Sequence, residues 1–247
     1  VGDCRLAVEG INEISRNKFS GQDMASRHAQ WIETIGEWKR EQPLTYAKGD
    51  KYLKPQHVVR VLNEITGGNA IITTEVGQNQ MWAAQFYDFD KPRTLITSGG
   101  LGTMGYGFPA AIGAQVAFPN KLVIDIAGDG SIQMNIQEMA TAVQNKLPVK
   151  IVILNNTYLG MVRQWQELFY KHNYSSTSMT GQPDFVKLAE AYGAEGYRIM
   201  TEEELAPTLK KALASPNTAI IDVVVEPEED VYPMVPAGAS LDEMLLV

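Results

Sequence analysis

The chain has 247 residues, of which 45% are hydrophobic and 20% charged, and its formal net charge is −8 at pH 7. This composition is that of a globular protein with a packed core, and the acidic balance argues against nucleic acid as a partner. No apolar run reaches the length of about 18 residues that a membrane span needs. The single cysteine, Cys4, excludes an intramolecular disulfide and favours a reducing compartment, so we expect a cytoplasmic protein.

The first fifty residues differ in pattern from the rest. Apolar spacing predicts helices from Asp3 to about Ile14 and from about Met24 to Arg40, and a linker without periodicity follows. Because the sequence opens on Val1 without a starting methionine, we expect it to be part of a longer protein. We therefore predict three parts: the end of a preceding domain with a connecting helix (1–50), a main domain (51–225) and a C-terminal tail (226–247).

Strands and helices alternate along the main domain. Short apolar runs rich in β-branched residues predict strands, and amphipathic segments between them predict helices. The predicted strands are 70–75, 94–97, 122–127, 149–154, 195–199 and 219–225, and the predicted helices are 55–65, 81–87, 110–117, 136–144, 160–170, 185–192 and 202–213. This alternation predicts an α/β fold, a doubly wound and mostly parallel sheet of about six strands with helices on both faces.

Two predicted strands end in residues that bind cations and phosphates. Gly128-Asp129-Gly130-Ser131 follows one strand, and Asn155-Asn156 follows the next strand along the chain. The carboxyl ends of parallel strands meet at one edge of the sheet, where ligands bind in open α/β folds. Carboxylate and amide oxygens suit Mg²⁺ or Ca²⁺, and the glycines let the backbone approach a phosphate closely. The alternative is a pair of ordinary Asp and Asn turns.

A second phosphate-loop interpretation competes with the first. Residues Gly100 to Gly105 match the pattern G-x-G-x-x-G of dinucleotide-binding folds, and Asp125 lies twenty residues beyond Gly105. However, Asp125 falls inside a predicted strand instead of at its tip, and Pro109 delays the start of the following helix. A dinucleotide-binding module therefore remains a minor alternative.

The spacing of the Gly-Asp-Gly and Asn-Asn motifs resembles the signature of thiamine diphosphate enzymes. Four further segments, 76–82, 98–107, 160–165 and 231–236, resemble the acetolactate synthase (acetohydroxyacid synthase) catalytic subunit and follow that family's order. The resemblance covers nearly everything from Lys51 to the end of the chain. It implies the C-terminal thiamine diphosphate-binding domain of a subunit more than twice this length.

The resemblance also implies roles for individual residues. Asp129, Asn156 and the backbone carbonyl of Tyr158 are expected to hold Mg²⁺. The expected cofactor-binding residues are Gln78, Asn79, Gly102, Met104, Gly128, Gly130, Ser131, Asn156, Gly160 and Met161. Met104 resembles the apolar residue over which the cofactor's two rings fold, and Met161 and Trp165 resemble substrate-channel residues. For these three, a place in the apolar core is the open alternative.

The implied activity is the condensation of two pyruvates, or of pyruvate and 2-oxobutyrate, with loss of CO₂ in branched-chain amino acid biosynthesis. The implied assembly is a homodimer or higher homo-oligomer, and a regulatory subunit is left open. In this family the Glu that activates the cofactor comes from the N-terminal domain of a partner subunit, so no catalytic residue is expected in this chain and the fragment alone should be inactive. FAD of the parent enzyme is not expected here. Sibling enzymes, such as pyruvate decarboxylase, pyruvate oxidase or glyoxylate carboligase, remain alternatives.

Overall fold

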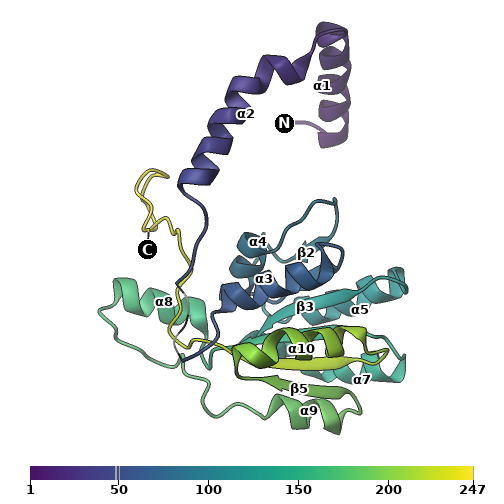
Figure 1. Cartoon of the computed structure of the whole chain (residues 1–247), viewed down its shortest axis with the longest axis vertical. Helices are drawn as coiled ribbons and strands as arrows, with labels where there is room; N and C mark the ends of the chain where they lie inside the picture. The colour runs from purple at the N-terminus through teal and green to yellow at the C-terminus, as the bar shows by residue number, and fades with distance from the viewer. Residues whose placement is uncertain (48, 50, 247) are drawn as a thin grey trace. The chain divides into compact units, whose positions relative to one another are not determined.

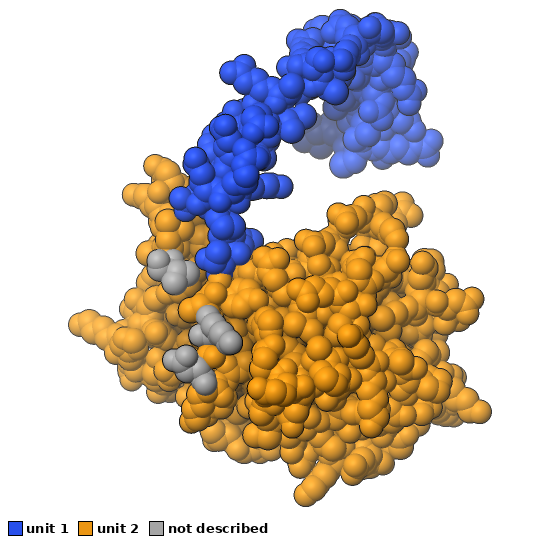
Figure 2. Space-filling view, viewed as in Figure 1, with its two compact units in different colours: residues 1–45 blue, residues 46–247 orange. Residues whose placement is uncertain are grey.

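The computed structural model describes residues 1–47, 49 and 51–246. By contacts the chain divides into two compact units, residues 1–45 and 46–247 (Figure 2). The predicted domain boundary at residue 50 and the last residue, Val247, lie outside the described residues. The division into a preceding domain, a main domain and a tail stays a prediction.

The first unit consists of two helices, α1 (Cys4–Phe19) and α2 (Met24–Glu41). Each begins after an aspartate whose carboxylate accepts backbone N–H groups of the first turn, Asp3 for α1 and Asp23 for α2. Both helices were predicted, and both run further than the apolar spacing indicated. Neither contains a buried residue, and most of their apolar side chains are exposed.

The second unit is built on a six-stranded sheet in which every pairing is parallel (Figure 1). Its strands are β1 (Ile71–Thr74), β2 (Leu95–Thr97), β3 (Val123–Gly128), β4 (Lys150–Asn155), β5 (Glu195–Ile199) and β6 (Ala219–Val224). Their order across the sheet is β2-β1-β3-β4-β6-β5. The predicted fold is confirmed, and each strand lies within about a residue of the predicted range because the buried apolar runs define it.

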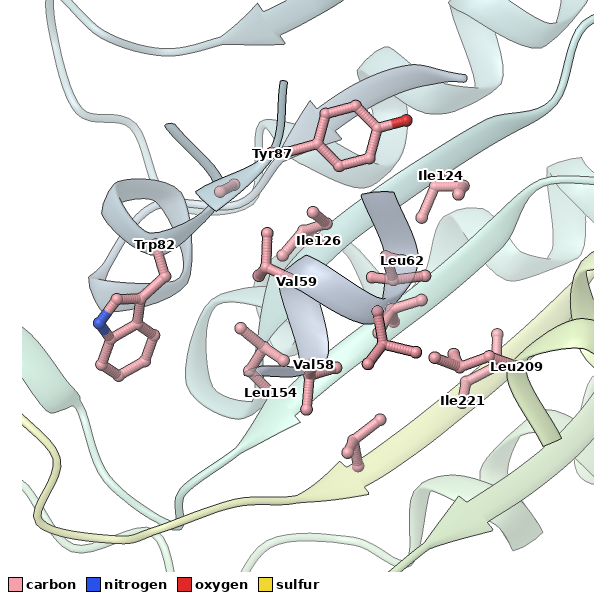
Figure 3. Packing of buried hydrophobic residues seen from close by; sticks show 14 of the residues in the cluster. Val58, Val59, Leu62, Trp82, Tyr87, Ile124, Ile126, Leu154, Leu209 and Ile221 are labelled. Carbon is pink, nitrogen blue, oxygen red and sulfur yellow. The ribbon is translucent and has the colours of Figure 1, made fainter. Parts of the chain in front are cut away.

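Helices cover both faces of this sheet. They are α3 (Pro55–Thr66), α4 (Gln78–Phe86), α5 (Gly107–Ala117), α6 (Asp129–Ile132), the 3₁₀ helix η1 (Gln133–Glu138), α7 (Met139–Gln144), α8 (Gly160–Phe169), α9 (Phe185–Ala191) and α10 (Glu202–Ala214). Successive side chains of a strand point to opposite faces, so β3 contributes Ile124 and Ile126 to one core and Val123 and Ala127 to the other. Figure 3 shows the first core, where α3 and α10 pack on the sheet.

The helices after β1 and β3 differ from the prediction. α4 begins at Gln78, three residues before the predicted start, and α6 begins at Asp129 directly after β3. The predicted helix over 136–144 is only partly α-helical: η1 occupies 136–138 and α7 begins at Met139, while the helical backbone breaks at Asn135 (φ −134°), just before the predicted range. Asn135 Nδ2 donates to the carbonyl of Gly105 at 2.6 Å, which holds the chain in this break. Within the described residues, no helix is long and apolar enough to cross a membrane.

Candidate cofactor and metal site

The two motif loops meet at the carboxyl edge of the sheet. β3 and β4 are neighbours, with Gly128 paired to Leu154, so the residues that follow them lie side by side. Asp129 opens α6 immediately after β3, and Asn156 directly follows β4. The structure thus brings together the two side chains that the sequence singled out as cation ligands.

Asp129 is a buried carboxylate that forms no salt bridge with any of the residues that the structure describes. Asp129 is only 1% exposed. Burial raises the pKa of Asp129 to about 7, although hydrogen bonds from nearby backbone N–H groups oppose the rise. Among the described residues, its Oδ2 atom has no hydrogen-bond partner. A buried oxygen of this kind is costly unless something binds it, and a divalent cation would satisfy it.

Asn156 and its neighbours form the other half of the edge. Asn156 Oδ1 accepts the N–H of Tyr158 at 3.1 Å, and its Nδ2 donates to Gln78 Oε1 at 3.2 Å. Asn155 anchors the same loop, since its Nδ2 donates to Asp222 Oδ1 on β6 at 2.8 Å. Within the described part of the chain, no group of three or more His, Cys, Asp or Glu side chains is placed to hold a metal. The donor set at this edge is therefore one carboxylate with neutral oxygens, which suits Mg²⁺ bound partly through phosphate.

A cavity of about 270 Å³ opens beside these loops. Most of the predicted cofactor residues line it, namely Gln78, Asn79, Gly102, Met104, Gly130, Ser131, Asn156, Tyr158, Gly160 and Met161. Gly128, Asp129 and Trp165 are not in its lining. Trp165 lies further along α8, where it is 43% exposed and meets Phe169 edge to face with ring centroids 5.8 Å apart.

The side chains of Gln78 and Asn79 are committed to protein partners. Asn79 Nδ2 donates to the carbonyls of Glu75 at 3.0 Å and Ile126 at 2.9 Å. Gln78 Nε2 donates to Gln164 Oε1 at 3.0 Å and to the carbonyl of Glu229 at 2.8 Å. Any phosphate contact at these two positions would therefore use backbone N–H groups in the first turn of α4. Their role in cofactor binding stays a prediction.

Glu75 organises the glycine-rich loop, residues 98–107, although no sequence pattern singled it out. Its carboxylate accepts the N–H of Gly105 at 2.7 Å, the N–H of Phe108 at 3.0 Å and the hydroxyl of Ser131 at 2.6 Å. Burial raises the pKa of Glu75 above its usual value, and the hydrogen bonds from these donors only partly oppose the rise. The available signal was an acidic residue at the end of the predicted strand 70–75.

Asp125 bears on the dinucleotide alternative. It is fully buried within β3, where its Oδ1 accepts the hydroxyl of Thr73 at 3.0 Å. Burial, followed by the nearby Glu75 carboxylate, raises the pKa of Asp125 well above its usual range. A carboxylate in this position does not lie at a strand tip, where a ribose would meet it. The geometry therefore counts against a dinucleotide role for Asp125.

Comparison with protein families identifies the class. Residues 75–223, more than half of the chain, match the family described as thiamine pyrophosphate enzyme, C-terminal TPP binding domain. The chain belongs to this family, and its α/β fold is consistent with a thiamine diphosphate-binding domain.

Within this class, the chain is clearly similar to catalytic or large subunits of acetolactate synthase. The chain is 46% identical over 249 residues to the acetolactate synthase isozyme 3 large subunit of Escherichia coli (strain K12). It is 47% identical over 252 residues to the mitochondrial acetolactate synthase catalytic subunit of Saccharomyces cerevisiae, and 43% identical over 250 residues to the chloroplastic acetolactate synthase 1 of Nicotiana tabacum. These alignments cover 100%, 99% and 98% of this chain but 43%, 36% and 37% of the relatives. The motif-based resemblance to acetolactate synthase catalytic subunits is confirmed.

Proposed function

We propose that this chain supplies the cofactor domain of an acetolactate synthase catalytic subunit. The whole enzyme would condense two pyruvates, or pyruvate and 2-oxobutyrate, with release of CO₂ in branched-chain amino acid biosynthesis. The observation that carries the proposal is the buried Asp129 carboxylate, with Oδ2 unpartnered among the described residues, beside Asn156 in a chain whose relatives carry that name. A transferase acting on small 2-oxo acids follows from the same resemblance, and the single cysteine supports a place in the reducing cytoplasm.

Mg²⁺ would be held by the Asp129 carboxylate, Asn156 Oδ1 and the Tyr158 carbonyl. The residues present fit the ion, because they offer hard oxygens and one of them is a buried acid lacking a partner in the described structure. Gly128 and Gly130 would let phosphate oxygens approach, and Ser131 would stand at the start of α6 beside them. The charge of the diphosphate would thus be met at the end of β3.

The apolar side of the cavity would receive the rings of thiamine diphosphate. When bound there, the cofactor would supply the carbanion-stabilising chemistry that reactions of 2-oxo acids need. Met104, which is half-buried in the cavity wall, would support the folded rings, and Gly102 would leave room for them. Met161 and Trp165 lie four residues apart on α8 and would border the path of the substrate.

The remaining parts of the active site would lie outside this chain. We propose that the activating Glu comes from the N-terminal domain of a partner subunit in a homodimer or higher homo-oligomer, so that no catalytic residue lies here and the chain alone is inactive. FAD would bind elsewhere in the subunit. The described chain would bind and orient the cofactor and exclude water from it.

The test is an assay of the full-length gene product with pyruvate, thiamine diphosphate and Mg²⁺. We expect acetolactate as the product. Release of CO₂ and acetaldehyde without acetolactate would instead assign a decarboxylase, such as pyruvate decarboxylase. Calorimetry separates the dinucleotide alternative, since tight binding of NAD without any response to thiamine diphosphate and Mg²⁺ would reject the cofactor site.

A further inference from the structure

The tail segment 229–231 is joined to α8 by two buried side chains. Arg163 Nη2 donates to the carbonyl of Glu229 at 3.0 Å and to Asp230 Oδ1 at 2.5 Å. Gln164, which is fully buried, pairs with both backbone groups of Val231: its Oε1 accepts the N–H and its Nε2 donates to the carbonyl, each at 2.9 Å. A backbone N–H only donates and a carbonyl only accepts, so this pair fixes which end of the Gln164 amide is oxygen.

The orientation of Gln164 determines that of Gln78. Gln164 Oε1 accepts from Gln78 Nε2 at 3.0 Å, and the carbonyl of Glu229 accepts from the same Nε2 at 2.8 Å. Two acceptors thus face one end of the Gln78 amide, and only the N–H₂ group satisfies both. The opposite end, Oε1, must then point away from the tail and toward Asn156.

The orientation of Gln78 in turn determines that of Asn156. Gln78 Oε1 accepts from Asn156 Nδ2 at 3.2 Å, so the N–H₂ end of Asn156 is occupied and its Oδ1 faces the loop that begins at Tyr158. This matters for a cation site, because the amide oxygen binds a metal ion and the N–H₂ group does not. An asparagine, unlike an aspartate, has one end that cannot serve as a ligand.

Close packing keeps these amides in place. A Cβ atom added to Gly160 would lie 2.0 Å from Gln78 Oε1 and 2.9 Å from Asn156 Nδ2. The glycine at the start of α8 therefore leaves the space that both amides fill.

We propose that Gln164 is a positioning residue for the metal site. The backbone of Val231 fixes the orientation of the Gln164 amide, which through Gln78 fixes that of Asn156. We call this series of hydrogen-bonded groups the amide relay; its members are Val231, Gln164, Gln78 and Asn156. The inference rests on the proposed function in one respect, the role of Asn156 as a Mg²⁺ ligand. It gives the tail segment 229–231 a task at the cofactor edge, and it assigns the side chain of Gln78 to holding Asn156.

The first test measures Mg²⁺ binding to the full-length gene product at saturating thiamine diphosphate by calorimetry. Gln164→Met removes the amide at nearly constant volume, and Gln144→Met on the exposed end of α7 is the matched control. We expect the Mg²⁺ dissociation constant to rise about tenfold in Gln164→Met, within the effect of partners that orient metal ligands, and to stay unchanged in Gln144→Met.

A double-mutant comparison separates orientation from general loosening of the tail. Asn156→Asp replaces the amide with a carboxylate whose two oxygens are equivalent, so no relay is needed to present the correct end. If Gln164 acts only by orienting Asn156, Gln164→Met in the Asn156→Asp background should change Mg²⁺ affinity by less than about twofold. An equal tenfold loss in both backgrounds would overturn the proposal and assign Gln164 a merely structural role.

A measurement on the metal-free chain keeps the inference independent of the proposed function. The side-chain N–H₂ protons of Asn156 should exchange with solvent faster in Gln164→Met than in the parent chain or in Gln144→Met. Unchanged exchange would reject the relay. Faster exchange in a chain that binds no Mg²⁺ would retain the relay as a structural link and reject the metal site.

Discussion

Ser131 donates its hydroxyl to the Glu75 carboxylate over 2.6 Å, which ties the start of α6 to the end of β1. The same carboxylate accepts the N–H groups of Gly105 and Phe108. Three segments of the cofactor edge therefore depend on one buried acid. Glu75 does not line the cavity itself, so it acts on the cavity indirectly, by holding the glycine-rich loop in place.

Replacing Glu75 by Gln tests this arrangement. The amide places an N–H₂ group where protein donors now point, so one donor loses its partner and the free energy of unfolding should fall by about 2–3 kcal/mol. Urea unfolding of the metal-free chain measures the change. Glu64→Gln, at an exposed position of α3, serves as the control and should remain within about 0.5 kcal/mol. A similarly small change in Glu75→Gln would contradict the role given to this carboxylate.

Asp129 predicts the pH dependence of the metal-free chain. Burial raises the pKa of Asp129 from 3.8 to about 7, so the folded state holds a proton that the unfolded state releases over this interval. The contribution to stability is complete below pH 4 and is lost as the pH rises to about 7. Asp129→Asn removes this loss, so it should stabilise the metal-free chain at pH 8 and not at pH 4. The stabilisation at pH 8 should be at most about 4 kcal/mol, which corresponds to a pKa difference of roughly three units. Thermal unfolding at both pH values measures it, and equal effects at both would contradict the shift.

Mg²⁺ binding should depend on the same proton. The cation needs the ionised carboxylate of Asp129, so binding releases the proton wherever the pH lies below a pKa of about 7. We expect affinity to weaken up to about tenfold per pH unit below that value and to level off above it. Calorimetry at pH 6 and pH 8, in buffers of different ionisation enthalpy, counts the released protons. Flat affinity across this range would remove Asp129 from the ligand set.

Gly160→Ala tests the packing of the amide pair. The added Cβ would meet Gln78 Oε1 at 2.0 Å, and such overpacking costs typically about 1–3 kcal/mol. Gly113→Ala in α5 is the control, because nothing lies within 4 Å of its added Cβ, and alanine there should gain about 0.5–1 kcal/mol. Chemical unfolding of both variants compares them. Stabilisation by Gly160→Ala would show that the space beside Gln78 is open.

Much of the fold could be predicted because its signals are local. Runs such as Val149 to Leu154 are apolar, short and β-branched, which defines buried parallel strands with little ambiguity. The Asp129 and Asn156 positions followed from the same reasoning, since each ends such a run. Neighbouring positions of β3 and β4 in the sheet then brought them together.

What the sequence could not provide depends on contacts between distant segments. Residues 226–247 show no periodicity, yet Val231 pairs with Gln164 through its backbone, which leaves no pattern in the side chains. Glu75 was interpreted only as the end of a strand because its three donors lie in segments 30 to 56 residues further along the chain. The break at Asn135 likewise depends on a bond to Gly105 and not on local propensity.

The position of β6 between β4 and β5 has a consequence for how the chain folds. β4 pairs with β6, for example Ile151 with Ile220, across nearly seventy residues, so the sheet stays incomplete until the last strand has been made. During synthesis, one edge of β4 and all of β5 would remain unpaired until β6 has been made. Pairings that close such long loops form slowly, and unpaired apolar edges invite aggregation. The yield of folded protein should therefore depend on chaperone capacity more than its final stability suggests.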